Sequence, residues 1–203
     1  MKKVLFMDYG QVMVRYNPYE LTAPFVSDEE DRLLVSEILF DRLYWDRLDA
    51  GTLEDEEFIS EVKKRLPMRL WNAAESIYES WAVSLPEISG MRELVLNIKK
   101  EFGVSACLIS NISKNFARRE GEIELLKIFE NKVYSAVSGF VKPSYEIFDY
   151  ACRVCGVLPS EAVFVDDSEK NIKGGENFGI DSVFFDGDSA KLYKELRKIF
   201  SKN

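Results

Sequence analysis

Polar side chains follow three short apolar runs of the sequence. Each run is continuous rather than alternating, which is typical of a parallel strand whose two faces are covered by helices. In an open parallel sheet, ligands bind outside the carboxyl ends of the strands. We therefore expect one sheet edge to collect these polar residues: Asp8 after residues 4–7, Ser110 and Asn111 after 106–109, and Asp166 and Asp167 after 162–165. Lys142, just before a predicted helix, is expected to join them.

These residue types suit a phosphate group and a magnesium ion. The Asp8 and Asp167 carboxylates are the hard oxygen ligands that Mg²⁺ prefers. Ser110, the backbone amide of Asn111 and the Lys142 ammonium would hold the phosphoryl oxygens and offset their charge. An aspartate that faces the phosphorus can attack it and form an aspartyl-phosphate. The pattern therefore predicts Mg²⁺-dependent phosphoryl transfer with Asp8 as the nucleophile.

Composition excludes several other kinds of chemistry and partner. The 203 residues include no histidine, which removes histidine-based triads and histidine-ligated zinc. With 27 basic and 35 acidic side chains, the net charge of −8 argues against a nucleic-acid partner. No apolar run approaches the ~18 residues of a membrane span, and the first run is too short for a signal peptide. We expect a cytoplasmic protein with no membrane partner, in which Cys152 and Cys155 serve as packing thiols.

The remaining hydrophobic patterns predict an α/β fold. Two further runs, 182–185 and the weaker 132–137, are candidate strands. Helical periodicity occupies the intervals, at residues 91–100, 145–155, 168–178 and 191–200. Alternation of strand and helix indicates a doubly wound parallel sheet, that is, a Rossmann-like core.

The segment between the first strand and residue 86 breaks this alternation. It contains three helical patterns and no strand-like run, with Thr52 as the expected N-cap of the second helix. We interpret residues 15–86 as an all-helical cap inserted into a core made of 1–14 and 87–203. Residues of the cap near the junctions are expected to face the cleft: Tyr16, Trp45, Arg47 and the turn at 49–51. Trp71 and Trp81 are expected to pack in the interior of the cap.

Four motifs of the chain, in this order, resemble those of the haloacid-dehalogenase-like (HAD) hydrolases. They are residues 6–12 (Phe-Met-Asp-Tyr-Gly-Gln-Val), 108–111 (Leu-Ile-Ser-Asn), 139–148 (Gly-Phe-Val-Lys-Pro-Ser-Tyr-Glu-Ile-Phe) and 163–172 (Val-Phe-Val-Asp-Asp-Ser-Glu-Lys-Asn-Ile). The resemblance covers essentially the whole chain. It implies a HAD-like fold with a C1-type helical cap, a Mg²⁺ cofactor and a small phosphorylated substrate, with sugar phosphates among the candidates.

The resemblance also assigns a role to each matching residue. Asp8 matches the nucleophile, Ser110 the phosphate-binding hydroxyl and Lys142 the phosphate-binding lysine. Asp167 matches the metal-binding acid, and Asp166 supports it. The backbone carbonyl of Gly10 also matches a metal ligand, and Asn171 matches a brace of the metal-binding loop.

Gly10 departs from the usual phosphatase motif. Most phosphatases of the family have a second aspartate at this position, which protonates the leaving group and then activates water. General acid–base catalysis of this kind is worth ~10²–10⁴-fold in rate. The Asp-x-Gly-x-Val form resembles a subgroup that includes sugar-phosphate phosphatases. The sequence thus predicts either a substrate with a good leaving group or a cap residue that lends the proton.

Three alternatives remain beside the phosphatase. An L-2-haloacid dehalogenase would use Asp8 without a metal, but that class has a tyrosine at the position of Gly10. A receiver domain has its acidic pair and its Lys-Pro pair in the opposite order and lacks a cap. A catalytically weak HAD-like protein could bind a phosphorylated ligand or a protein partner. Nothing in the sequence sets the oligomeric state.

Overall fold

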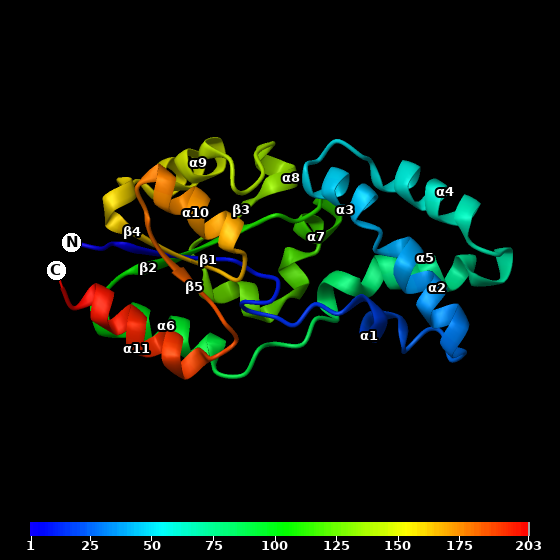
Figure 1. Cartoon of the computed structure of the whole chain (residues 1–203), viewed down its shortest axis with the longest axis horizontal. Coiled ribbons are helices and arrows are strands. Elements are labelled where there is room, and N and C mark those ends of the chain that lie inside the picture. Colours follow the sequence, from blue (N-terminus) through cyan, green and yellow to red (C-terminus); the bar gives the residue numbers. More distant parts are fainter. Residues whose placement is uncertain (203) are drawn as a thin grey trace.

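A parallel five-stranded sheet forms the centre of the molecule in the computed structural model, which describes residues 1–202 (Figure 1). The strand order is β3-β2-β1-β4-β5, and all neighbours are parallel. The strands are β1 (Val4–Met7), β2 (Ser105–Ser110), β3 (Asn131–Tyr134), β4 (Ala162–Asp166) and β5 (Asp181–Phe184). The predicted α/β doubly wound class is confirmed.

Helices cover both faces of the sheet, as the continuous apolar strands require. Helices α6 (Met91–Phe102) and α11 (Ser189–Phe200) pack on one face, and α9 (Tyr145–Cys155) and α10 (Glu169–Phe178) pack on the other (Figure 1). Alternate residues of a strand enter opposite layers: Leu5 joins the α6–α11 side, whereas Phe6 joins the α9–α10 side. Both layers bury apolar side chains, which fixes the register of the strands.

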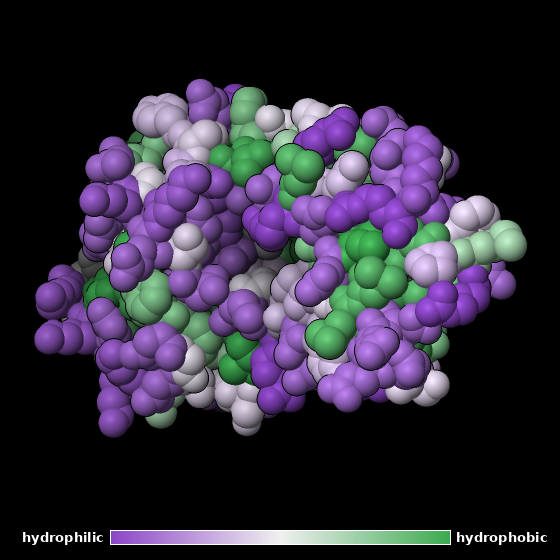
Figure 2. All heavy atoms as spheres, turned by 45° about the vertical axis from the view of Figure 1, so that its right-hand side comes forward, coloured by the Kyte–Doolittle hydropathy of each residue, from purple (hydrophilic) through white to green (hydrophobic). Residues whose placement is uncertain are grey.

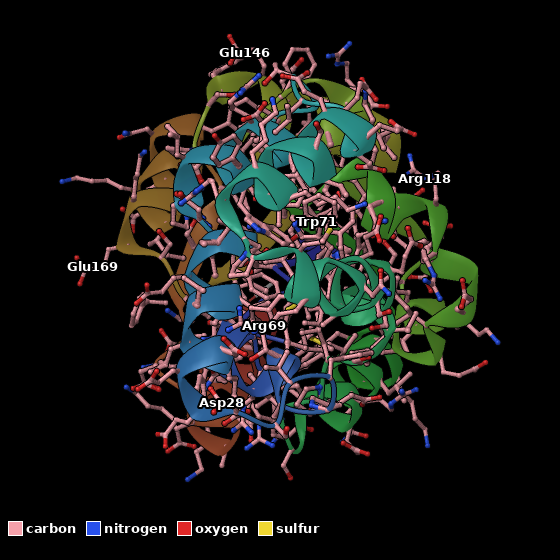
Figure 3. All side chains as sticks on the ribbon, turned by 90° about the vertical axis from the view of Figure 1, so that its right-hand side faces the viewer. Asp28, Arg69, Trp71, Arg118, Glu146 and Glu169 are labelled. Carbon is pink, nitrogen blue, oxygen red and sulfur yellow. The ribbon has the colours of Figure 1, made fainter. Side chains whose placement is uncertain are left out.

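The long connection from β1 to α6 is helical and lies beyond the carboxyl ends of the strands (Figure 1). Its helices are α1 (Pro18–Thr22), α2 (Glu29–Leu39), α3 (Arg42–Asp49), α4 (Asp55–Arg65) and α5 (Trp71–Ser80). We call this helical segment the cap. The indole of Trp71 donates to the carbonyls of Lys63 and Leu66, so this side chain packs among the cap helices, as expected (Figure 3).

The two connections between cap and core run side by side. Val14 forms an antiparallel bridge with Glu87, the Arg15 amide donates to the Pro86 carbonyl, and the Ile88 amide donates to the Met13 carbonyl. The exact limits 15–86 for the cap stay a prediction. Among residues 1–202, no helix is long and apolar enough to cross a membrane.

Several local predictions are wrong, each because a polar side chain redirects the backbone. The weak run at 132–137 is strand only to Tyr134; helix α8 (Ser135–Ser138) follows, and the Ser135 hydroxyl accepts the Ile112 amide. The first cap pattern is divided where the Asp41 carboxylate caps α3 by accepting the Leu43 amide at 3.0 Å. Helix α4 begins after Glu54, not after Thr52, whose hydroxyl donates instead to the Arg47 carbonyl.

Besides α8, two short helices went unpredicted, although both have clear N-terminal signals. Asn17 caps α1 and Pro18 occupies its first position, as is typical of helix starts. Ser113 caps α7 (Lys114–Arg118) by accepting the Phe116 amide. Each helix has five residues, too few for a periodic hydrophobic pattern to appear.

Candidate active site

The carboxyl edge of the three central strands brings the predicted residues together. Met7 of β1 pairs with Leu108 of β2 and with Val165 of β4, so the next residues of all three strands emerge at the same edge. The Ser110 hydroxyl donates to Asp8 Oδ1 at 2.8 Å. Asp8 is only 8 % exposed, and its Oδ2 has no side-chain partner among the described residues.

Lys142 lies between two carboxylates of this edge. Its Nζ is 2.7 Å from Asp8 Oδ1 and 2.6 Å from Asp166 Oδ2. Burial opposes the charged form of the lysine, but the two carboxylates prevail and raise the pKa of Lys142. The side chain therefore stays an ammonium at neutral pH and holds one charge against the two carboxylates.

The segment that carries Lys142 is fixed from two sides. Asn111 accepts the Lys142 amide at 2.7 Å through Oδ1 and donates to its carbonyl at 3.1 Å through Nδ2. Helix α10 presses against the next residue, Pro143: a Cβ added at Gly174 would lie 2.5 Å from the Pro143 Cβ. Only glycine allows this approach. The Asn111 side chain thus positions Lys142, a task that the sequence did not reveal.

Asp166 accepts hydrogen bonds from its own loop as well as from Lys142. The Ser168 amide donates to Oδ1 at 2.8 Å, and Asn171 Nδ2 lies 3.0 Å from Oδ1 and 3.2 Å from Oδ2. Asn171 thus holds Asp166 at the start of the loop that follows β4. The neighbouring Asp167 is half-buried, and it makes no side-chain hydrogen bond or ion pair within residues 1–202.

The carboxylates of this edge fit a hard divalent cation. Asp8, Asp166 and Asp167 can each offer one oxygen, and the three oxygens lie within 4.8 Å of one another. Oxygen donors at this spacing suit Mg²⁺. Burial, with the nearby Asp166 charge, raises the pKa of Asp167, as expected of a carboxylate that lacks a cationic partner.

The electrostatics of Asp8 reflect its burial. Desolvation raises the pKa of Asp8 to about 6, opposed by Lys142 and supported by the Asp166 charge. Without Lys142 beside it, the buried carboxyl would hold its proton still more tightly. The ammonium therefore keeps the candidate nucleophile in its reactive, ionised form at neutral pH.

A cavity of about 180 Å³ opens above Asp8, between the sheet edge and the cap. Figure 2 shows the surface hollowed between these two parts of the molecule. The core side of the wall contains Asp8, Gly10, Ser110, Asn111, Lys142 and Asn171. The cap side contains Tyr16, Arg42, Trp45, Asp49 and Trp81.

The cap predictions are met only in part. Tyr16 and Trp45 line the cavity, but Arg47 does not; it lies 3.6 Å from Glu57 and is about half exposed. Trp81 is 3 % exposed, and it also reaches the cavity wall, because a buried side chain can pack on one side and face a hollow on the other. Arg42 was missed, since nothing in its local pattern marks it as facing the cleft.

This site and fold define an enzyme with a Rossmann-like parallel sheet and a candidate nucleophilic aspartate at the end of its first strand. Residues 20–179 match the family described as haloacid dehalogenase-like hydrolase, and the chain belongs to this family. It is 26 % identical to a D-ribitol-5-phosphate phosphatase of Bacteroides thetaiotaomicron, over 99 % of this chain and 100 % of that protein. It is 22 % identical to the sesquiterpene phosphatase astK of Aspergillus oryzae, over 97 % of this chain and 96 % of that protein.

A solved structure has the same fold. It is a HAD family enzyme from Bacteroides thetaiotaomicron, in complex with magnesium and inorganic phosphate, with a TM-score of 0.73 and 19 % identity. The similarity covers 95 % of this chain and 99 % of that chain. The chain is thus an enzyme of the HAD-like hydrolase family, with phosphatases among its full-length relatives.

Proposed function

We propose that the chain is a Mg²⁺-dependent phosphomonoester hydrolase that works through an aspartyl-phosphate on a small phosphorylated metabolite. One observation carries the proposal: Asp8 accepts a hydrogen bond from Ser110 and forms an ion pair with Lys142, and it also belongs to a group of three carboxylates whose oxygens lie within 4.8 Å of one another. The full-length phosphatase relatives support it. We assign the chain to the Asp-x-Gly-x-Val subgroup with a C1-type cap, on its motif and its helical insertion.

The proposed reaction assigns the nucleophile and the phosphate-binding groups to residues of the sheet edge. Asp8 attacks the phosphorus through Oδ2, the oxygen that carries no side-chain hydrogen bond. Ser110, the Asn111 amide and Lys142 hold the phosphoryl oxygens, and the Lys142 charge offsets theirs in the transition state.

Asp8 and Asp167 would hold the Mg²⁺ ion, with Asp166 and the Gly10 carbonyl as further ligands. When bound, the ion supplies positive charge next to the phosphoryl group. Asn171 and Lys142 keep Asp166 in place, so the acidic loop does not need to rearrange to accept the ion.

The cavity sets the size and chemistry of the substrate. At about 180 Å³ it is smaller than the ~300–1,000 Å³ of typical drug-sized pockets, so it suits a short phosphorylated molecule. Tyr16, Trp45 and Trp81 offer aromatic surface, whereas Arg42 and Asp49 offer polar contacts. Sugar or polyol phosphates fit this mixture, and the D-ribitol-5-phosphate phosphatase relative makes them the first compounds to test.

Two other activities fit the site less well. A dehalogenase displaces halide without a metal, so it would have no use for the close group of Asp8, Asp166 and Asp167. A non-catalytic binding protein would not need Asp8 to keep one carboxylate oxygen free of side-chain donors. Both alternatives remain separable from the phosphatase by experiment.

The test is hydrolysis of an aryl phosphate with and without Mg²⁺, for the wild type and for Asp8→Asn. The amide has nearly the same size as the carboxylate but is not a nucleophile. We expect Mg²⁺-dependent turnover that Asp8→Asn abolishes. Asp149→Asn, at a solvent-accessible acid of α9 that pairs with Arg153, is the matched control and should keep full activity.

The remaining outcomes separate the alternatives. Turnover that survives Asp8→Asn would contradict the aspartyl-phosphate mechanism. Binding of inorganic phosphate without any turnover would favour the binding protein. Release of halide from an L-2-haloacid without Mg²⁺, in place of phosphate hydrolysis, would favour the dehalogenase.

A further inference from the structure

The cavity contains few groups that could protonate a leaving group. Gly10 has no side chain, and Lys142 is fixed between two carboxylates. Arginine stays protonated at all relevant pH values, which excludes Arg42. Burial raises the pKa values of Tyr9 and Tyr16 far above neutrality, so neither can exchange a proton with substrate in both directions.

Asp49 is the one other acid on the cavity wall within the described residues. It ends helix α3 and is 8 % exposed. Within residues 1–202, its carboxyl group makes no hydrogen bond and no ion pair, although most buried carboxylates have a partner. An unpartnered carboxyl that faces the same cavity as Asp8 is available to a substrate.

The core holds the backbone of Asp49 in place. The Ser135 hydroxyl donates to the Asp49 carbonyl at 2.5 Å. Two residues on, Gly51 has a φ of 69°, and a Cβ added there would lie 2.6 Å from the Ala136 carbonyl oxygen. Because Ser135 and Ala136 belong to α8 of the core, the turn at 49–51 is seated directly on the part of the molecule that carries the nucleophile.

The surroundings of Asp49 favour a carboxyl group that can both give and accept a proton. Burial raises its pKa to about 7. Arg42 on the same helix and Lys142 of the core lower this pKa, whereas Asp46 on the same helix and Asp8 of the core raise it. The charge of Asp49 in turn raises the pKa of Tyr16. General acids and bases work best when their pKa lies near the working pH.

We propose that Asp49 is the general acid and base of the reaction, in place of the second aspartate that Gly10 lacks. This inference rests on the proposed phosphatase function. In the first step a bond forms between Asp8 Oδ2 and phosphorus, the bond from phosphorus to the ester oxygen breaks, and that oxygen takes the Asp49 proton and leaves as an alcohol. In the second step a water oxygen bonds to phosphorus and gives its proton to Asp49. The bond from phosphorus to Asp8 then breaks, and inorganic phosphate leaves.

The test compares two esters that differ in their leaving group, with Mg²⁺ present. Dinitrophenyl phosphate releases an oxygen that needs no proton, whereas an alkyl phosphate releases one that does. We expect Asp49→Asn to lower kcat/KM on the alkyl ester ~10²–10⁴-fold, the usual worth of a general acid, and to change kcat/KM on the dinitrophenyl ester by less than about tenfold. This parameter ends with the departure of the leaving group, so it excludes the second step, in which Asp49 acts as the base for both esters. The ratio of the two rates does not depend on the fraction of folded enzyme, so partial misfolding cannot imitate this result.

The pH profile gives a second readout. Wild-type kcat/KM on the alkyl ester should fall as pH rises through about 7, because Asp49 in the free enzyme loses the proton that it donates. The pH profile of Asp49→Asn should not show this decrease. Glu37→Gln, an exposed carboxyl-to-amide change on α2 that lies outside the cavity wall, should leave both the ratio and the profile as in the wild type.

The outcomes distinguish this inference from the function on which it rests. An equal loss of kcat/KM on both esters in Asp49→Asn would overturn the role of Asp49. The phosphatase would still stand if Asp8→Asn abolished turnover. If the wild type hydrolyses neither ester, the proposed function fails and the role of Asp49 fails with it.

Discussion

Gly10 leaves room at the position where the phosphatase motif that the chain resembles has a second aspartate. A Cβ added there would meet no atom within 4 Å, so a side chain can enter the cavity without displacing the backbone. The residue next to it, Gln11, has a φ of 58°, and its side chain bonds to both backbone groups of Tyr16. This turn is thus held independently of whatever side chain occupies position 10.

We therefore predict that an acid at position 10 replaces the one at position 49. In the Asp49→Asn background, Gly10→Asp should raise the rate on an alkyl phosphate at least about tenfold, because general acid catalysis is worth ~10²–10⁴-fold. Steady-state kcat/KM on the two esters is the measurement. Gly10→Asn has nearly the same shape but no proton to give, and it should restore nothing; equal rescue by both variants would contradict the prediction.

The strand-end residues could be identified from the sequence because their placement depends on local pattern. Asp8, Ser110 and Asp166 each follow an apolar run, and equal register across parallel strands brings such positions together. Arg42 and Trp81 could not be found in this way. They reach the cavity only through the packing of the cap on the core, which no periodicity within the cap encodes.

At the scale of elements, the strands and longer helices were predictable and the short or interrupted ones were not. Helix α9 has the predicted bounds, because eleven residues are enough to show a full apolar face. The β3–α8 boundary failed because Tyr134 and Val137 suit a strand, while the turn between them is set by contacts of Ser135 with distant residues. Side chains that bond across the fold leave no periodic trace in the sequence.

The turn between α3 and α4 gives a prediction at this scale. Gly51→Ala should lower kcat on alkyl phosphates, because a Cβ 2.6 Å from the Ala136 carbonyl oxygen must push the turn, and Asp49 with it, away from the core. Gly103→Ala is the matched control: its φ is 66°, but its Cβ would meet no atom within 4 Å.

The left-handed backbone should cost each variant about 1–3 kcal/mol of the free energy of unfolding, and Gly51→Ala should lose more because its Cβ also meets the Ala136 carbonyl oxygen. Chemical denaturation measures this loss, and initial rates measure activity. At a temperature where both variants are still folded, only Gly51→Ala should have a lower initial rate than the wild type. Full activity in this variant would mean that the contact with Ala136 does not position the cavity wall.

At the scale of the whole molecule, cap and core share one hydrophobic interior. Trp81 packs against Phe116 of the core, with ring centroids 5.7 Å apart, and Trp45 packs against Trp81 at 4.9 Å. Ion pairs continue the contact at the surface, between Arg118 of α7 and Asp55 of α4 (Arg118 is labelled in Figure 3) and between Lys114 and Glu54. The cavity is therefore enclosed by a packed interface.

A metal ion that binds at the edge of the sheet should stabilise the whole molecule. At about 100 times its Kd, Mg²⁺ adds about 2.7 kcal/mol, or roughly 5–10 °C in Tm for a chain of this size. Thermal unfolding with Mg²⁺ or with EDTA measures the shift. Asp167→Asn removes a proposed ligand and should abolish most of it, and an undiminished shift in that variant would place the ion elsewhere.

The bridge between Val14 and Glu87 brings the two ends of the insertion together in the fold. A segment whose two ends meet can be lengthened, shortened or exchanged without altering the path of any strand. The residues that would attack phosphorus belong to the strands, whereas the proposed proton donor and most of the aromatic wall belong to the insertion. A change of preferred substrate could thus arise by replacing one contiguous stretch of the gene while the nucleophile and its acidic neighbours stay as they are.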